Sequence, residues 1–304
     1  MSNQLVSVTV ISYNSSATIL ETLESIKNQS YPRLELIISD DCSKDNTVAV
    51  CQEWIENNKD RFERLKLLTS DQNQGVCANG NKAKRAIKGE WVKGIAADDI
   101  LLPNCISDFM GYVNKNKNIS FVTSWLKVYN ETFDEENCIE EKKGPKDLRI
   151  FDQPVEVQLR QMAYSSFIQA PSIFYKKEVF DTVGGYTDKY PYEDHPFYMD
   201  VLEHGYKLYF MDKVTVGYRV HQSASHSSNK LFNYQFLQKT HRFKKERCFK
   251  YYTKRKKLAT YLMWFVEWAM YSLHLDKANS LNRFMYDVQM AILARLGGRV
   301  KYKS

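Results

Sequence analysis

Residues 34–45 read LELIISDDCSKD, an apolar β-branched run that ends abruptly in two acids and a turn. Such a run predicts a buried strand over Leu34–Ser39. A similar run, LVSVTVISY at residues 5–13, predicts an earlier strand. Between the two, Asn14-Ser15-Ser16 provides a helix start, and a helix is indicated by the spacing of Ile19, Leu20, Leu23 and Ile26.

The same alternation continues downstream. Asp45 or Asn46 can cap a helix through Ile55, and residues 65–68 predict a third strand. A helix is expected from Gly75 to about Ile87, a fourth strand over residues 91–95, and another helix from Pro103. This order predicts a Rossmann-like, mostly parallel central sheet flanked by helices. Ligands of such sheets bind at the carboxyl ends of the strands, so the turns after strands two and four should hold the chemistry.

The second half of the chain is less regular. Residues 130–160 are polar and acidic, and we expect a loop or insertion there. Residues 171–175 predict a strand, and residues 176–183 a helix that Gly184-Gly185 closes. Beyond about residue 228 the pattern is helical and basic. We therefore expect a catalytic domain over residues 1–228 and a helical C-terminal extension over residues 229–304.

Composition excludes several classes of protein. Apolar residues make up 43% of the 304 residues and charged residues 26%, which excludes a disordered chain. The net charge of +7 is too small to indicate nucleic-acid binding, but it suits phosphate ligands or an anionic membrane. The six cysteines form no C-x-x-C pair, so we expect free thiols in the cytoplasm. The most apolar stretch, residues 258–275, contains Glu267 and His274 and is not expected to span a membrane.

Two acidic pairs follow the predicted strands. Asp40-Asp41 ends the second strand, and Asp98-Asp99 ends the fourth among apolar neighbours. Adjacent carboxylates repel unless a cation neutralises them, and carboxylate oxygens suit Mg²⁺ or Mn²⁺. The structural alternative is that both pairs are ordinary turns, and for Asp45 a helix-capping role is favoured.

The ordered set of motifs resembles the family 2 glycosyltransferases of the GT-A fold. The resemblance covers roughly residues 5–225. Its motifs are residues 8–14, VTVISYN; residues 19–32, ILETLESIKNQSYP; the segment Leu34–Asp45; residues 75–81 with Gly89-Glu90-Trp91-Val92; and Gly184-Gly185-Tyr186 with Glu193-Asp194.

The resemblance implies roles for individual residues. Tyr13 and Asp41, with Asp40 as neighbour, would line the base and ribose pocket of a nucleotide. Asp98, with Asp99 beside it, would bind Mn²⁺ or Mg²⁺ and a diphosphate, and Asp194 would be the catalytic base. Further contacts are expected from His221 on the metal, Arg219 on phosphate, Asn81, Lys82 and Arg85 on the nucleotide, and Glu193, His195 and Gln169 near the acceptor.

Three positions depart from the family pattern. The first acid of the usual Asp-x-Asp is Ala96, so metal binding would rest on Asp98 and Asp99 or water. The usual Gly of Asp-Asp-Gly-Ser is Cys42. The frequent Arg-Asn pair is Gly80-Asn81, so the diphosphate or ribose contact is expected from Lys82, Lys84 or Arg85 instead.

The resemblance implies an inverting transfer of a hexose or N-acetylhexosamine from a UDP-sugar to a glycan, in bacterial surface-polysaccharide assembly on a lipid carrier. One alternative is a catalytically inactive member that binds glycan or nucleotide as a scaffold. A nicotinamide-dependent oxidoreductase is disfavoured, because Ser12–Ser16 replaces the G-x-G-x-x-G that would follow the first strand.

The C-terminal extension opens with a basic and aromatic run. Residues 241–257 read HRFKKERCFKYYTKRKK and contain nine Lys or Arg. Apolar residues at helical spacing follow: Leu258, Tyr261, Leu262, Phe265, Trp268 and Ala269. Three interpretations stay open: peripheral contact with the anionic inner face of the cell membrane, homo-oligomer contact, or plain packing. Nucleic-acid binding is not expected, because no nucleic-acid-binding motif accompanies the run.

Overall fold

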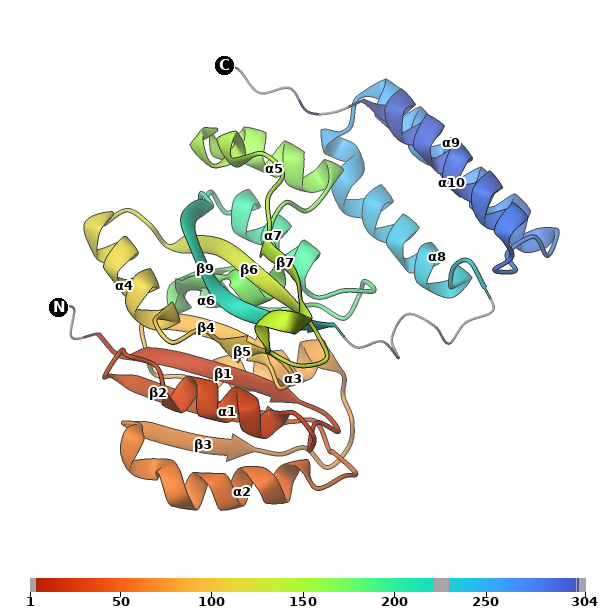
Figure 1. Ribbon diagram of the computed structural model, residues 1–304. Coiled ribbons are helices and arrows are strands. Elements are labelled where there is room, and N and C mark those ends of the chain that lie inside the picture. The colour runs from red at the N-terminus through yellow and green to blue at the C-terminus, as the bar shows by residue number, and fades with distance from the viewer. Residues whose placement is uncertain (1–3, 221–229, 299, 301–304) are drawn as a thin grey trace.

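Nine strands form one mixed sheet in the computed structural model, which describes residues 4–220, 230–298 and 300 (Figure 1). Their spatial order is β3-β2-β1-β4-β8-β6-β9-β5. β7 is outside this order and pairs with the C-terminal half of β6. The strands are β1 (Val6–Ser12), β2 (Leu34–Asp40), β3 (Arg64–Leu68), β4 (Trp91–Ala96), β5 (Ile100–Leu101), β6 (Phe121–Asn130), β7 (Cys138–Lys143), β8 (Phe174–Lys176) and β9 (Tyr209–Val220).

The first four strands confirm the predicted parallel arrangement. β1 lies between β2 and β4 and is parallel to both, and β3 pairs in parallel with β2. In this register Ser12 lies opposite Asp40 on one side, and Ile11 lies opposite Ala96 on the other. The residues that follow these three strands therefore emerge at the same edge of the sheet.

The second half of the sheet is mixed. β8 joins the two halves by pairing antiparallel with β4 and β6, and β9 runs parallel to β6. The expectation of a loop over residues 130–160 was wrong, because β7 pairs antiparallel with β6 there. The acidic letters of this segment concealed the strand, since β7 is an exposed edge strand whose side chains need not be apolar.

Helices cover both faces of the sheet, as predicted. They are α1 (Ile19–Lys27), α2 (Thr47–Asn58), α3 (Val76–Arg85), α4 (Cys105–Lys115), α5 (Val155–Tyr164), α6 (Lys177–Val183) and α7 (Asp194–Glu203), followed by the C-terminal α8 (Tyr234–Phe243), α9 (Lys254–Ser272) and α10 (Ser280–Gly297). In the described part of the chain, no helix is long and apolar enough to cross a membrane. All six cysteines are free thiols.

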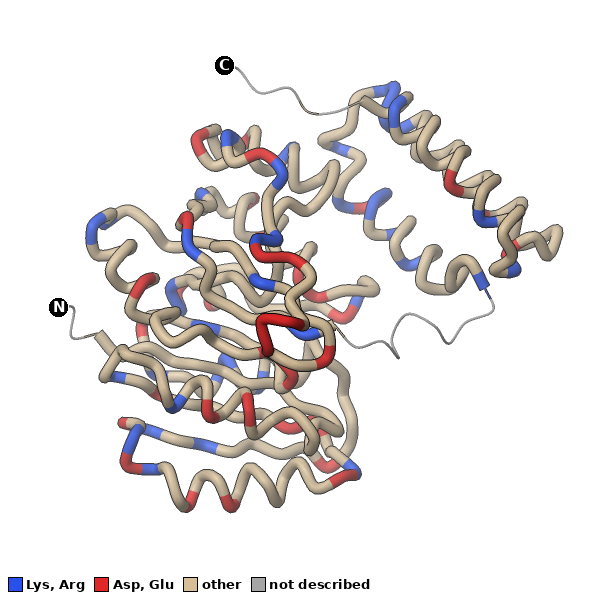
Figure 2. Tube along the Cα trace, in the orientation of Figure 1, with Lys and Arg blue, Asp and Glu red and all other residues tan. Residues whose placement is uncertain are grey.

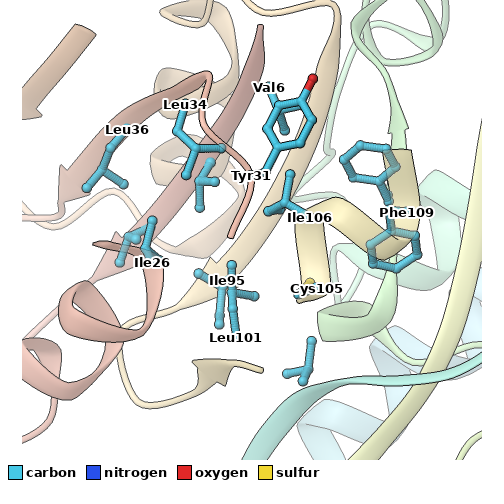
Figure 3. Packing of buried hydrophobic residues seen from close by; sticks show 14 of the residues in the cluster. Val6, Ile26, Tyr31, Leu34, Leu36, Ile95, Leu101, Cys105, Ile106 and Phe109 are labelled. Carbon is cyan, nitrogen blue, oxygen red and sulfur yellow. The ribbon is translucent and has the colours of Figure 1, made fainter. Parts of the chain in front are cut away.

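Two apolar cores form because alternate strand residues face opposite sides of the sheet. On β2, Leu36 and Ile38 belong to one core and Ile37 to the other. In Figure 3 the first core brings Val6 and Leu34 of the strands against Ile106 and Phe109 of α4. The second core packs α3, α5, α6 and α7 on the opposite face.

Aromatic stacking fixes β8 at the junction of the two half-sheets. The Phe174 ring is fully buried, with its centroid 5.0 Å from that of Trp91 and 4.9 Å from that of Phe109. Both contacts are stacked, and they join β8, β4 and α4. This cluster holds the β1–β4 half of the sheet, whose turns carry the acidic pairs, against the half that leads to α7.

We expect Phe174→Ala to lower the free energy of unfolding by about 3–5 kcal/mol, because it removes a buried ring and leaves a cavity between Trp91 and Phe109. Urea unfolding measures the effect. Phe284→Ala is the matched control, since that ring is 67% exposed and should change the free energy by less than about 0.5 kcal/mol. Equal losses in the two variants would contradict this account of the core.

Candidate functional site

The exit turns of β1, β2 and β4 are tied together by hydrogen bonds between side chains and backbone. The hydroxyl of Ser12 donates to Asp40 at 3.0 Å, and the amide of Ser15 donates to the Thr47 hydroxyl at 2.8 Å. The Thr18 hydroxyl donates to the carbonyl oxygen of Ala97 at 2.8 Å. These bonds give the carboxyl edge of the sheet a fixed shape before any ligand binds.

An open cleft of about 320 Å³ lies along this edge. It receives residues from the turns after β1, β2 and β4 and from the start of α3. The lining includes Tyr13, Ser15, Asp41, Asn73, Gly75, Val76, Asn79, Ala96 and Asp98. The ring of Tyr13 is 46% exposed, which leaves a face available for stacking. The turns after β2 and β4, which the sequence predicts to hold the chemistry, therefore lie along one cleft.

The two acids after β2 have different environments. Asp40 is fully buried and accepts hydrogen bonds from the hydroxyls of Ser12 and Ser43 and from the Ser43 amide, so it holds the turn together. Asp41 lines the cleft and accepts from the backbone amides of Gln74 and Gly75, at 3.0 and 2.7 Å. Of the pair, Asp41 is placed to meet a ligand and Asp40 is placed to position it.

Cys42 occupies a backbone position that favours glycine. Its φ of 66° lies in the left-handed region, where a Cβ atom costs about 1 kcal/mol. The thiol of Cys42 donates to the carbonyl oxygen of Asp71, which supports the turn and gives the side chain a structural role.

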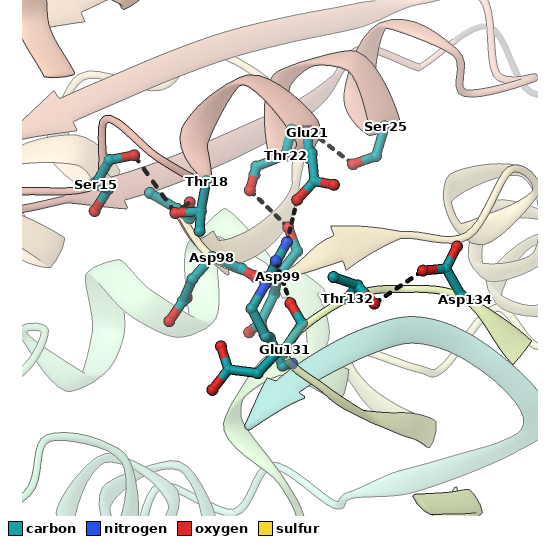
Figure 4. A network of polar contacts seen from close by, with 12 residues as sticks. Ser15, Thr18, Glu21, Thr22, Ser25, Asp98, Asp99, Glu131, Thr132 and Asp134 are labelled. Carbon is teal, nitrogen blue, oxygen red and sulfur yellow. Dashed lines mark hydrogen bonds and ion pairs between the residues drawn. The ribbon is translucent and has the colours of Figure 1, made fainter. Parts of the chain in front are cut away.

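The acids after β4 also divide into one at the cleft and one that is buried (Figure 4). Asp98 lines the cleft, whereas Asp99 is 1% exposed and accepts from the backbone amide of Arg219 at 2.9 Å. Burial raises the pKa of Asp99 to about 7. This environment does not suit Asp99 as a ligand for a cation in the cleft, so the expected metal-binding pair is reduced to Asp98.

Arg219 acts as a clamp on this turn. Its guanidinium donates to the carbonyl oxygens of Asp98 and Glu131 and pairs with the carboxylate of Glu21. The side chain is 7% exposed and stacks over Phe133, with 4.3 Å between guanidinium carbon and ring centroid. Its donors are engaged inside the protein, so the structure favours a positioning role over the expected phosphate contact.

A divalent cation could bind at Asp98 only if substrate phosphates or water supplied its other ligands. Within the described residues, no three His, Cys, Asp or Glu side chains gather into a metal-binding group. His221, the other predicted ligand, lies outside the described residues. Mg²⁺ and similar ions are commonly held by one or two carboxylates together with substrate phosphates and water, and one carboxylate at the cleft is compatible with that arrangement.

The three predicted nucleotide contacts on α3 point elsewhere. The Asn81 side chain bonds both backbone groups of Tyr186, at 2.8 and 2.9 Å, and the Lys82 ammonium donates to the Asp40 carbonyl oxygen and the Ser70 hydroxyl. Arg85 is the last residue of α3, whose first turn lies at the cleft. At 1.5 Å per residue it sits about 13 Å further along the helix, so Arg85 is removed from the proposed site.

Glu193 and Asp194 begin α7 and line a second cavity. Asp194 is the first residue of the helix, and its carboxylate accepts from the amide of His195 at 2.7 Å. The positive end of the helix dipole favours negative charge here. Burial raises the pKa of Glu193. The Asp194 carboxylate therefore bonds the first turn of α7 and also lines the cavity.

The second cavity, of about 120 Å³, adjoins the cleft and shares Ile11, Val76 and Ala96 with it. Its deeper wall contains the fully buried Tyr198, whose hydroxyl has no hydrogen-bond partner. Because an unpaired buried hydroxyl is costly, this group is a candidate for bonding a ligand. Glu193 and Asp194 thus line a cavity that adjoins the cleft.

Sequence reasoning named Lys84 only as an alternative diphosphate or ribose contact, and did not foresee its place in the second cavity. Its ammonium lies in this cavity at 4% exposure, 3.4 Å from the Thr9 hydroxyl and 5.2 Å from the Tyr186 ring centroid. Burial, and secondarily repulsion from Lys93, lower the pKa of Lys84 to about 8. The available signal was the spacing of Gly80, Lys84 and Ile87, which places a lysine on the buried face of α3.

The remaining predicted acceptor residues lie behind the cavity. His195 is bonded through Nε2 to the carbonyl oxygen of Met162 at 2.7 Å, and burial lowers its pKa, so it supports α7 as a neutral side chain. Gln169 precedes the short helical turn Ala170–Ser172, and its carbonyl oxygen accepts from the Ser172 amide and hydroxyl. The cavity wall itself is formed by the next two residues, Ala170 and Pro171.

Comparison with known proteins identifies the family. The model for Glycosyl transferase family 2 matches residues 7–183, so the chain belongs to this family of glycosyltransferases. The chain is 27% identical over 230 residues to the UDP-Glc:alpha-D-GlcNAc-diphosphoundecaprenol beta-1,3-glucosyltransferase WfaP of Escherichia coli, covering 75% of this chain and 81% of that protein.

Two further similarities support the assignment. The GalNAc(5)-diNAcBac-PP-undecaprenol beta-1,3-glucosyltransferase of Campylobacter jejuni is 26% identical over 273 residues, which is 84% of this chain and 81% of that protein. The solved structure of S. aureus TarS 1-349 in complex with UDP-GlcNAc superposes with a TM-score of 0.61 at 18% identity, over 96% of this chain and 81% of that one. The structural match shows the shared GT-A fold.

We expect Lys84→Met to stabilise the free protein at neutral pH. The folded state lowers the pKa of this lysine, so the charged lysine destabilises the protein. This destabilisation is complete below pH 8 and disappears as the pH rises toward 10.5. The gain should be on the order of 2 kcal/mol at pH 7 and should shrink by pH 10. Urea unfolding at the two pH values measures it, with the exposed Lys88→Met as control. A loss of stability at pH 7 would show that the ammonium is fully compensated.

Proposed function

We propose that this glycosyltransferase moves a hexose, with glucose as the first candidate, from UDP to a glycan hydroxyl with inversion. The observation that carries the proposal is that Asp41 and Asp98 line a cleft at the carboxyl edge of the sheet, and Asp194 lines the cavity that adjoins it. The relatives named for UDP-glucose and lipid-diphosphate acceptors support this donor and an acceptor of the same class.

The nucleotide would bind in the cleft. Tyr13 offers an exposed ring for the base, and Asp41 offers a carboxylate whose orientation is fixed by two backbone amides. The start of α3 beside them places backbone amides and a helix dipole near the phosphates. The base would therefore stack on Tyr13, while the donor sugar extends toward the cavity of Lys84 and Tyr198.

Asp98 would hold Mn²⁺ or Mg²⁺ together with the diphosphate. When bound, the ion neutralises negative charge on the departing nucleoside diphosphate. With Ala96 in place of a second acid, we expect the ion to bind weakly without nucleotide. Asp99 and Arg219 serve this arrangement by fixing the turn from behind.

Asp194 would act as the base. The anomeric carbon passes through an oxocarbenium-like state as the acceptor oxygen attacks from the face opposite the leaving diphosphate. The carboxylate of Asp194 takes the acceptor's hydroxyl proton as the new bond forms. Because the attack is a single displacement from the opposite face, the configuration inverts. Its position on the first turn of α7, where its carboxylate accepts from the His195 amide, holds it in place.

The names of the relatives support an acceptor of the lipid-diphosphate class. An acceptor on a lipid carrier lies at a membrane, so we propose that the catalytic unit, residues 1–228, works at the inner face of the cell membrane in surface-polysaccharide assembly. Residues 229–304 would form a separate extension. Self-association through the C-terminal helices is a second possible use of that extension.

A thermal-shift experiment with UDP, GDP, CDP and dTDP, each with Mn²⁺ or EDTA, tests the donor site. We expect UDP to stabilise the protein, by about 2.7 kcal/mol at a hundredfold excess over Kd, and only with Mn²⁺ present. Asp98→Asn should abolish the stabilisation by UDP that depends on Mn²⁺. Asp108 lies outside the cleft, so Asp108→Asn should behave like wild type. A response equal in EDTA and Mn²⁺ would contradict the assignment of Asp98.

We expect Asp194→Asn to lower kcat by at least about 10³-fold with UDP-glucose and a lipid-diphosphate GlcNAc acceptor, because the amide cannot accept the hydroxyl proton. The UDP thermal shift should be unchanged, since Asp194 lies outside the nucleotide cleft. Asp188→Asn is the matched control and should retain activity. Full activity in Asp194→Asn would overturn the role of the base, and inactivity of wild type with every donor would favour a scaffold.

A further inference from the structure

The C-terminal helices carry an unusually large exposed apolar surface. Of the twenty large hydrophobic side chains that are exposed in the described residues, fourteen lie between residues 258 and 296. Surface hydrophobes on a soluble domain are normally scattered, and a concentration of this kind marks an interaction site. Figure 2 shows the same region as a mostly uncharged pair of helices at the outer end of the molecule.

Five exposed apolar residues of α9 form one stripe. Leu258, Tyr261, Leu262, Phe265 and Trp268 follow one another at intervals of three, one, three and three residues, which places them on one helix face. Their exposed fractions run from 38% to 62%. The opposite face is the one that packs inward, with Ala259, Thr260, Glu267 and Met270 buried. The stripe contains no charged residue.

A second stripe lies on α10. Leu281, Phe284, Met285, Val288 and Ile292 have the same helical spacing and are 38–67% exposed. The two helices pack against each other, and Lys256 near the start of α9 lies beside Gly297 at the end of α10, so they form an antiparallel hairpin. The hairpin therefore presents apolar side chains over both of its helices.

Basic residues gather where α9 begins and α10 ends (Figure 2). Lys254 and Arg255 precede Leu258 by four and three residues, so they lie at the end of the apolar stripe. Neither residue, nor Lys257, makes an ion pair within the part of the chain that the structure describes. A positive cluster at the end of an apolar, Tyr- and Trp-containing stripe matches the composition of helices that lie in a lipid interface.

The middle of the basic and aromatic run, residues 243–252, is mostly used inside the protein, so packing, one of the three open interpretations, accounts for that part of the run. Arg247 pairs with Asp200 and Glu203 of α7, and Lys250 also pairs with Glu203. The aromatic residues Phe243, Phe249 and Tyr252 of this run are buried in the second core. This segment attaches the extension to the catalytic domain and leaves the hairpin as its outward surface.

We propose that the α9–α10 hairpin lies in the surface of an anionic bilayer, with the α9 stripe inserted and Lys254 and Arg255 at the headgroups. A lipid surface is favoured over a second copy because the chain carries a net charge of +7 and the face ends in unpaired cations. Two copies would bring like charges together, whereas acidic headgroups neutralise them. This inference assigns a specific surface and does not depend on the donor or the reaction.

Vesicle flotation with the full chain tests the proposal. We expect wild type to float with vesicles of about 30 mol% phosphatidylglycerol in phosphatidylcholine at about 0.15 M salt, and more weakly with phosphatidylcholine alone. Phe265→Ser with Trp268→Ser should reduce the partition coefficient roughly tenfold or more, because two exposed aromatic rings no longer leave water. Lys254→Glu with Arg255→Glu should remove the preference for anionic vesicles.

Ile139→Ser is the matched control, since Ile139 on β7 is 62% exposed, the same as Phe265, but lies far from the hairpin in the sequence. It should float like wild type. The UDP thermal shift should persist in every variant, which separates failure here from failure of the donor site. The proposal is overturned if wild type does not float, if the Phe265/Trp268 variant floats unchanged, or if that variant only converts a dimer to a monomer.

Discussion

The parallel register of β1 with β2 and β4 is the constraint on which the site depends. Because Ser12 lies opposite Asp40 and Ile11 opposite Ala96, the turns that follow these strands leave the sheet at the same level. Three turns from different parts of the sequence are thereby brought to one edge. A shift of one residue in either pairing would turn Asp41 or Asp98 to the other side of the sheet.

A second set of interactions determines which acids meet the ligand. At each acidic pair one carboxylate is bonded into the turn and its neighbour faces the cleft. Asp40 is held by Ser12 and Ser43, and Asp99 by the Arg219 amide. Lys84 follows a different logic, because its buried ammonium lowers the stability of the free protein while supplying a donor inside the cavity. The protein is therefore destabilised by the same group that would bind a ligand.

The sequence predicts the first half of the fold well, because β1, β2 and β4 are largely buried on both faces and read as mainly apolar runs. β7 could not be found in this way, since an exposed edge strand carries no apolar pattern. The cleft at the ends of β2 and β4 was also predictable from strand order. The division of labour between Asp40 and Asp41 was not, because it depends on the left-handed turn at Cys42 and on amides of a distant loop.

The direction of α3 explains why Arg85 was wrongly expected at the nucleotide. Arg85 is close in sequence to the residues at the start of α3, but the helix carries it about 13 Å from the cleft. The basic run at residues 241–257 resembles a membrane-binding segment by composition, yet its partners on α7 could be known only from the packed structure. Charge patterns of this kind identify a surface only when the acids opposite them are known.

A crystal structure with UDP-glucose and Mn²⁺ tests the central claim most directly, namely that the two acidic turns and Asp194 form one donor site. The account predicts the uracil against Tyr13 and Asp41, the diphosphate and the ion at Asp98, and the glucose in the cavity lined by Lys84, Tyr198 and Asp194. Binding of UDP-glucose anywhere else, or with Asp98 remote from the diphosphate, would contradict it.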